Sequence, residues 1–121
     1  KLAPANGTIE RYRLQSWLNF IGTEIHKSCS AFFNPASGDD WKKIAAANLE
    51  RRLGYVNEQL EGKPYLMGED FSVADGYLFT VLGWMPFIKI DLAKWPNLAA
   101  FVDRVAARPA VRAALKAEKG A

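Results

Sequence analysis

Apolar residues occupy every face of the stretch that runs from Val73 to Ile88, which is the strongest hydrophobic pattern in the chain. A helix that is apolar all round lies inside a domain, and this stretch is too short to span a membrane. Pro86 lies near its end and has no backbone N–H with which to continue a helix. The pattern therefore predicts a buried central helix around which the other helices pack.

Ser72 and Asp75 stand at the start of that helix with the spacing of a capping box. In this motif the Ser72 hydroxyl accepts a hydrogen bond from the N–H of Asp75, and the Asp75 carboxylate accepts one from the N–H of Ser72. Little water reaches the start of a buried helix, so its free N–H groups must find partners inside the protein. We therefore expect a capping box to begin the central helix.

From Thr8 to Phe33, apolar residues recur at spacings of three and four, which predicts a long first helix. Thr8 is its candidate N-cap, and Asn34-Pro35 is expected to end it. The apolar stripe of this helix consists of Leu14, Trp17, Leu18, Ile21, Ile25, Cys29 and Phe32.

A second stripe on the same helix is polar and consists of Gln15, Asn19, Thr23, His26 and Ser30. Asn19 and His26 are seven positions apart, which places them on one face, two turns from each other. Two interpretations are open. The stripe is either a half-buried face whose polar groups are satisfied within the fold, or one wall of a polar small-molecule pocket in which His26 forms a hydrogen bond.

The remaining patterns predict three further helices. One extends from about Asp39 to about Leu60, the next opens at Trp95-Pro96, and a short last helix starts at Pro109. Their expected inward-facing side chains are Trp41, Ile44, Ala45, Leu49, Leu53, Val56, Leu98, Phe101, Val102, Val105, Val111, Ala114 and Leu115. Since no alternating strand pattern occurs, the predicted fold class is all-α, a five-helix bundle around the central helix.

Composition narrows the classes of function. The 121 residues suffice for one domain with a sizeable core, and an apolar share of 50% excludes a disordered tail. The net charge of +3 is weak evidence for nucleic acid binding. One cysteine and one histidine exclude an internal disulfide and argue against a metal site. Residues 1–7 show no signal-peptide pattern and resemble a linker before a domain at 8–121, so we expect a cytoplasmic protein.

Three smaller patterns have alternative interpretations. Cys29 follows His26 by three residues, so a nucleophile pair is conceivable, but its place on the apolar stripe favours core packing. Four central-helix residues either line an apolar ligand site or belong to the core, namely Tyr77, Trp84, Met85 and Phe87. A basic repeat is expected to form a solvated face because Pro109 interrupts it, and it consists of Arg104, Arg108, Arg112 and Lys116.

Several segments together resemble one known family, the C-terminal domain of glutathione transferases. Residues Phe71–Asp75 resemble its capping motif, and Leu60–Asp70, with Pro64–Leu66 and Gly68, resemble the segment before it. The stretches Trp17–Ile21 and Glu24–Lys27 are similar to the first helix of bacterial beta-class enzymes, and Arg108–Val111 fit the C-terminal pattern. The resemblance covers nearly the whole chain and implies the helical half of a detoxifying transferase.

The resemblance also implies a reaction and a set of site residues. The glutathione thiolate would add to a hydrophobic electrophile, with glutathione as a substrate, no metal cofactor, a homodimeric assembly, and no nucleic acid or membrane partner. The main catalytic cysteine would lie in a thioredoxin-like N-terminal domain, and His26 would assist. The implied glutathione-binding residues are Asn19, Thr23, Glu24, His26 and Lys27, and the implied hydrophobic-substrate residues are Ser30, Phe33 and Trp84.

Two departures from the family pattern leave other functions open. The expected thioredoxin-like domain is absent from this chain, and Gly76 offers Phe71 no side chain with which to complete a hydrophobic staple, unless another helix packs closely there. One alternative function is a non-catalytic interaction module for protein assembly, against which the polar stripe argues. Another is a fragment without an activity of its own.

Overall fold

The computed structural model describes residues 2–120, so Lys1 of the predicted linker and Ala121 of the predicted domain lie outside it. The fold is all-α, as predicted, and the described residues contain no strand, only an isolated bridge between Tyr65 and Gly68. The elements are α1 (Ile9–Phe20), η1 (Ile21–His26), α2 (Lys27–Phe33), α3 (Asp39–Gln59), α4 (Val73–Leu82), η2 (Met85–Ile88), η3 (Leu92–Lys94), α5 (Pro96–Ala106) and α6 (Pro109–Gly120).

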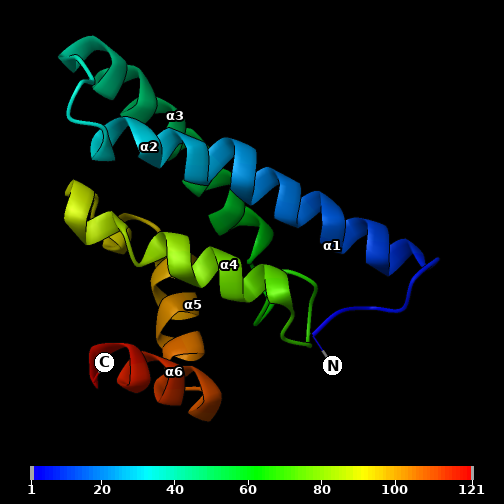
Figure 1. The fold of residues 1–121 in the computed structure, drawn as a ribbon. Helices are drawn as coiled ribbons and strands as arrows, with labels where there is room; N and C mark the ends of the chain where they lie inside the picture. Colours follow the sequence, from blue (N-terminus) through cyan, green and yellow to red (C-terminus); the bar gives the residue numbers. More distant parts are fainter. Residues whose placement is uncertain (1, 121) are drawn as a thin grey trace.

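The first predicted helix is a continuous helical rod with a change of geometry in its middle. Figure 1 shows α1 and α2 running end to end across the molecule, with α3 alongside. The predicted caps are confirmed, because Thr8 accepts a hydrogen bond from the N–H of Arg11 at 3.2 Å and Asn34 ends α2 in an extended conformation. Between them, η1 is a π-helix, in which the N–H of Lys27 bonds to the carbonyl of Gly22. The sequence pattern did not predict this segment.

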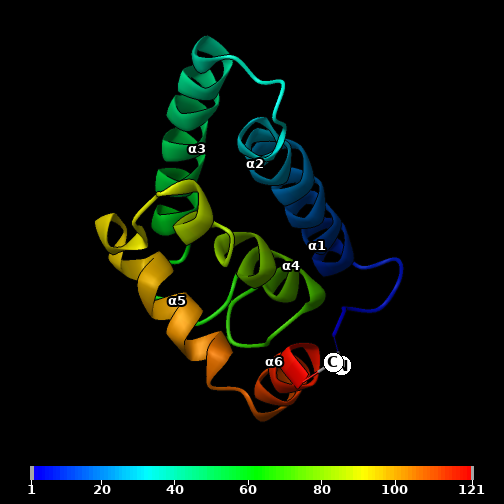
Figure 2. The same cartoon turned by 60° about the vertical axis from the view of Figure 1, so that its left-hand side comes forward.

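Helix α4 is the predicted central helix. Figure 2 shows it in the middle of the domain, with the rod, α3, α5 and α6 around it. Its inward residues Leu78, Val81 and Leu82 have no exposed surface. The helix is shorter than predicted, because it ends at Leu82 and continues after a turn as the 3-10 helix η2, whose second residue is Pro86.

Two predictions of burial at the ends of this stretch are wrong. Val73 is 39% exposed at the first position of α4, and Phe87 is 80% exposed on η2. Both residues lie at the ends of the stretch, where neighbouring elements no longer cover it. The all-apolar pattern therefore identifies the buried middle of the stretch but predicts a longer buried segment than the structure contains.

The predicted capping box is present at the start of α4. The fully buried Asp75 carboxylate accepts hydrogen bonds from the N–H of Ser72 at 2.8 Å and from the Ser72 hydroxyl at 3.1 Å. Its other oxygen accepts from the N–H of Leu66 at 2.8 Å. Burial raises the pKa of Asp75, and the hydrogen bonds from Leu66 and Ser72 oppose that rise. One carboxylate therefore caps α4 and also fixes the preceding loop.

The predicted inner faces of α3 and α6 are too wide. Trp41 is 48% and Ile44 is 61% exposed on the first turns of α3, which Figure 2 shows extending past α5 and α4. On α6, Val111 packs against the core, whereas Ala114 and Leu115 are exposed. Helix α6 lies at the edge of the domain, so only its first turn reaches the core (Figure 1).

The expectation of a solvated basic face is wrong for two of its four members. Arg104 donates a hydrogen bond to the carbonyl of Pro64 at 2.7 Å. Arg108 donates to the Tyr65 hydroxyl at 3.1 Å, and its guanidinium lies 4.1 Å from the centre of the Phe71 ring. These two arginines tie the end of α5 to the loop before α4, and the remaining two side chains, Arg112 and Lys116, are exposed.

Gly76 stands where a side chain would complete a hydrophobic staple with Phe71, so a substitution there tests the effect of the missing side chain. A Cβ built there lies 3.9 Å from Phe71 Cζ, an ordinary contact, and among the described residues no other helix approaches it within 4 Å. We therefore expect Gly76→Ala to raise the free energy of unfolding by about 0.5–1 kcal/mol, because alanine favours the helical state. The measurement is the urea midpoint of the full-length protein. Gly68→Ala is the matched control and should lower the midpoint, since Gly68 has a φ of +116°.

Candidate functional site

The candidate site is built around His26, the last residue of η1. Its Nδ1 lies 2.6 Å from the hydroxyl oxygen of Tyr77 on α4, and the two rings meet edge to face with centroids 5.8 Å apart. The Tyr77 hydroxyl also lies over Gly22, where a Cβ would be 3.5 Å from it. The central helix therefore reaches the first helical rod through one polar contact, at the segment where the rod changes to π geometry. Such π segments are frequent at functional sites.

Aromatic side chains form the wall beside His26. The Trp84 ring lies edge to face with the imidazole at 4.9 Å between centroids, and Phe33 lies edge to face with Trp84 at 5.9 Å. An open cavity of about 460 Å³, closer to a surface groove than to an enclosed pocket, is lined by His26, Ser30, Phe33, Asn34 and Trp84. This volume is within the range of small-molecule sites. The arrangement offers an apolar wall with one hydrogen-bonding nitrogen at its edge.

The residues named for the hydrophobic substrate thus gather at one cavity, whereas the other named residues lie outside its lining. Ser30, Phe33 and Trp84 come together with His26 from η1, α2 and the turn between α4 and η2. The remaining four side chains lie along the rod outside this cavity, and they are Asn19, Thr23, Glu24 and Lys27.

Two of those four side chains already have partners within the domain. The Thr23 hydroxyl donates to the carbonyl of Asn19 at 2.8 Å, so it satisfies the rod's own backbone. Glu24 forms a salt bridge with the Arg52 Nε at 2.8 Å across to α3. Lys27 is exposed. A ligand reaching Glu24 would therefore share it with Arg52.

The sequence analysis missed two members of the site. The sequence pattern offers Tyr77 as an apolar-site residue or a core residue, and neither interpretation uses its hydroxyl, the polar group on an otherwise apolar helix that was the available signal. Asn34 was assigned only to the helix end, and it also lines the cavity.

Cys29 belongs to the core, as expected, and not to a nucleophile pair. It has no exposed surface, and burial raises the pKa of its thiol to about 11. A thiol in that environment carries almost no thiolate near neutral pH, so it does not serve as a nucleophile.

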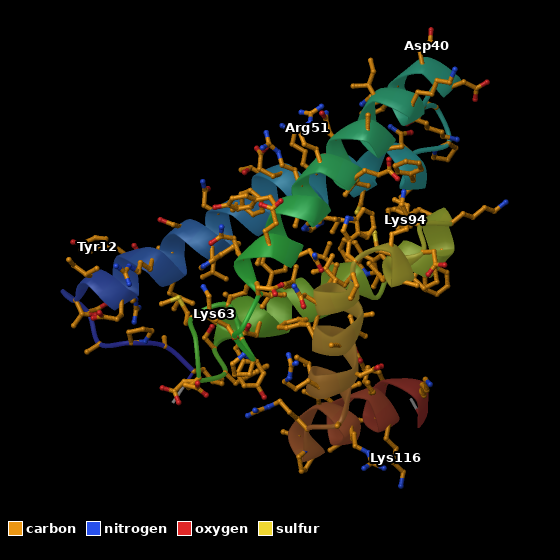
Figure 3. All side chains as sticks on the ribbon, turned by 180° about the vertical axis from the view of Figure 1, so that it is seen from behind. Tyr12, Asp40, Arg51, Lys63, Lys94 and Lys116 are labelled. Carbon is orange, nitrogen blue, oxygen red and sulfur yellow. The ribbon has the colours of Figure 1, made fainter. Side chains whose placement is uncertain are left out.

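Other features bear on metals, membranes and charge. Among residues 2–120, no group of three His, Cys, Asp or Glu side chains is placed to hold a metal ion. Within the same range, no helix combines the length and hydrophobicity that a bilayer crossing requires. Figure 3 shows Arg51 on α3, Lys63 in the turn after it, Lys94 on η3 and Lys116 on α6, so cationic side chains are spread over several elements.

Comparison with known proteins identifies the family. A family model described as the glutathione S-transferase C-terminal domain matches residues 20–109. Glutathione S-transferase GstA of Escherichia coli is 44% identical over 117 residues, which make up 97% of this chain and 58% of the relative.

Two solved structures have the same fold as this chain. The ternary complex of BphK, a bacterial glutathione transferase, superposes with a TM-score of 0.96 at 58% identity, covering 98% of this chain and 59% of that one. The bacterial beta-class glutathione S-transferase of Sphingomonas chungbukensis gives a TM-score of 0.91 at 48% identity, covering 97% and 58%.

The chain spans about three fifths of the length of these relatives. Within that length the match extends over nearly all of its residues, including the capping motif, the first helical rod and the central helix. The chain therefore belongs to the C-terminal domain family of the glutathione S-transferases, as predicted, and is similar to bacterial beta-class members.

Proposed function

We propose that the full-length protein is a glutathione transferase and that this domain supplies the wall on which a hydrophobic electrophile binds. The observation that supports this role is the cavity where His26, held by Tyr77, lies beside the Trp84 and Phe33 rings. The family membership and the relatives' names support glutathione transfer as the reaction. The cavity is where we propose that the electrophile binds.

In the proposed reaction the sulfur of glutathione forms a bond to an electrophilic carbon, and the leaving group departs with the bonding electrons. The apolar wall holds the electrophile and keeps water from it, which raises the effective concentration of the two reactants. His26 contributes an imidazole hydrogen bond at the edge of that wall. Its role is assisting, because the family resemblance implies that the main catalytic cysteine lies in a thioredoxin-like N-terminal domain.

The rest of the proposed assembly follows from the family resemblance. Asn19, Thr23, Glu24 and Lys27 would lie along the glutathione molecule, some of them along the one bound by a partner subunit of a homodimer. Residues 1–7 would belong to a linker before the domain at 8–121, and the protein would be cytoplasmic. The Glu24–Arg52 salt bridge bears on this proposal, because it already orients the Glu24 carboxylate at 2.8 Å.

The test is the His26→Ala variant of the full-length protein. We expect kcat/KM for glutathione-dependent conjugation of chlorodinitrobenzene to fall about two- to tenfold, the worth of one hydrogen bond. Arg112→Ala on the exposed side of α6 is the control and should leave the rate unchanged.

Two results would contradict the proposal in different ways. Equal rates for His26→Ala and the control would remove His26 from the site. Failure of the full-length protein to bind glutathione in a calorimetric titration, together with co-purification of a large protein partner, would instead support the assembly-module alternative.

A further inference from the structure

We infer that Tyr77 is a positioning residue that holds His26 in the tautomer with its proton on Nε2, so that the site presents an N–H donor to its ligand. The inference rests on the proposed function for its consequence in catalysis, but its structural part concerns these two side chains alone. The sequence pattern offers Tyr77 only as an apolar-site residue or a core residue and gives its hydroxyl no role.

The first argument is the contact itself. The His26 Nδ1 and Tyr77 oxygen are 2.6 Å apart, within hydrogen-bonding distance. A phenolic hydroxyl carries one proton to donate, and an unprotonated ring nitrogen is an acceptor. The contact therefore fits the Tyr77 hydroxyl as the donor and the unprotonated Nδ1 as the acceptor. A neutral imidazole with a bare Nδ1 carries its proton on Nε2.

The second argument is the supply of partners. Among residues 2–120, Nδ1 of His26 is the one protein group within hydrogen-bonding distance of the Tyr77 hydroxyl. If Nδ1 carried the proton, the hydroxyl hydrogen would have no protein acceptor in the described part of the chain. Donation from the half-buried Tyr77 hydroxyl to Nδ1 of the exposed His26 ring satisfies both groups with one bond.

The third argument is the rigidity of the donor. Tyr77 lies between the capping residue Asp75 and the fully buried Leu78 on the central helix, so its backbone is fixed by the core. Its hydroxyl lies over Gly22, in the π segment that also carries His26. The ring of His26 also packs edge to face with Trp84, with 4.9 Å between the ring centroids. A hydrogen bond between two fixed groups loses little side-chain entropy and so orients the imidazole well.

The chemical consequence concerns the ligand. An imidazole held as the Nε2–H tautomer donates a hydrogen bond and does not accept a proton at that nitrogen. Such a donor suits an anionic acceptor, which is what a thiolate sulfur is, and it stabilises the charged form without removing a proton. Within the proposed function, His26 is then a donor to the thiolate rather than a general base.

The experiment compares Tyr77→Phe with the wild type by nitrogen NMR of histidine-labelled full-length protein without glutathione, under conditions where the imidazole is neutral. The His26 signals are assigned by their loss in His26→Gln. We expect wild-type Nδ1 to be unprotonated and hydrogen-bonded, and its resonance to move in Tyr77→Phe as a second tautomer becomes populated. Tyr12→Phe is the matched control, since Tyr12 is exposed near the start of α1 (Figure 3), and it should leave both signals unchanged.

Activity gives the second readout. We expect Tyr77→Phe to lower kcat for chlorodinitrobenzene about two- to tenfold, and to have no further effect in a His26→Ala background, because its action passes through His26. A proton on Nδ1 in the wild type, or an unchanged Nδ1 resonance in Tyr77→Phe, would overturn the inference. Since the NMR measurement needs no glutathione, its failure is distinct from a failure of the proposed function.

Discussion

Replacing Asp75 by alanine is expected to lower the free energy of unfolding by about 3 kcal/mol or more, since each buried donor left without a partner costs about 1–3 kcal/mol. The carboxylate of Asp75 accepts hydrogen bonds from the backbone N–H groups of Ser72 and Leu66, each 2.8 Å long, and Asp75 has no exposed surface. A loss of this size is a large part of the roughly 5–15 kcal/mol that stabilise an ordinary domain.

The measurement is urea unfolding of the full-length protein, with Asp70→Ala as the matched control. Asp70 is exposed and five positions earlier in the same region, so its loss should change stability by less than about 0.5 kcal/mol. Similar midpoints for the two variants would show that the Asp75 hydrogen bonds do not hold the start of α4 and the preceding loop. Asp75→Asn should fall between wild type and alanine, because an amide keeps one acceptor oxygen.

Features that depend on neighbouring residues could be predicted from the sequence. The capping box at Ser72 and Asp75, the N-cap at Thr8 and the helix end at Asn34 are all confirmed. Each of them involves residues within a few positions of each other, so the spacing of residue types carries the information. The burial of Cys29 follows in the same way from the apolar stripe on which it lies.

Features that depend on contacts between distant segments could not be predicted. The periodicity of α3 shows which face is apolar, but not that its start extends past α5 and leaves Trp41 and Ile44 exposed. Arg108 is 43 positions from Tyr65, and its role as an anchor of that loop follows only from the fold. A basic residue at every fourth position is typical of a solvated face. Here two of the four side chains instead form hydrogen bonds with the loop before α4.

The candidate site shows the same division. The polar stripe on the first helix indicated His26, but its partner Tyr77 lies 51 positions away on a helix whose apolar pattern concealed the hydroxyl's role. The π segment has no sequence signature of its own, because an extra residue in one helical turn is stabilised by packing and not by local propensity. The sequence therefore identified His26, whereas its partner Tyr77 could be identified only from the fold.

Replacing Trp84 by alanine is expected to lower kcat/KM for an aromatic electrophile about ten- to hundredfold. Trp84 makes edge-to-face contacts with both His26 and Phe33, each worth about 0.5–1.5 kcal/mol, and its indole supplies apolar area to the cavity wall. Without it, the electrophile loses a surface and His26 loses one of the groups that confine its ring. Trp84→Phe keeps an aromatic edge and should lose less activity.

The indole also packs against the core, so a fall in rate alone would not separate binding from folding. The measurement is therefore a ratio, the kcat/KM for chlorodinitrobenzene divided by that for iodoacetamide, a small electrophile with no ring. Both rates scale with the folded fraction, so the ratio depends only on the site. We expect Trp84→Ala to lower this ratio at least about fivefold, and Trp41→Ala, which removes an exposed indole from α3, to leave it unchanged. Equal losses with both electrophiles would mean that Trp84 supports the fold and that the aromatic substrate binds elsewhere.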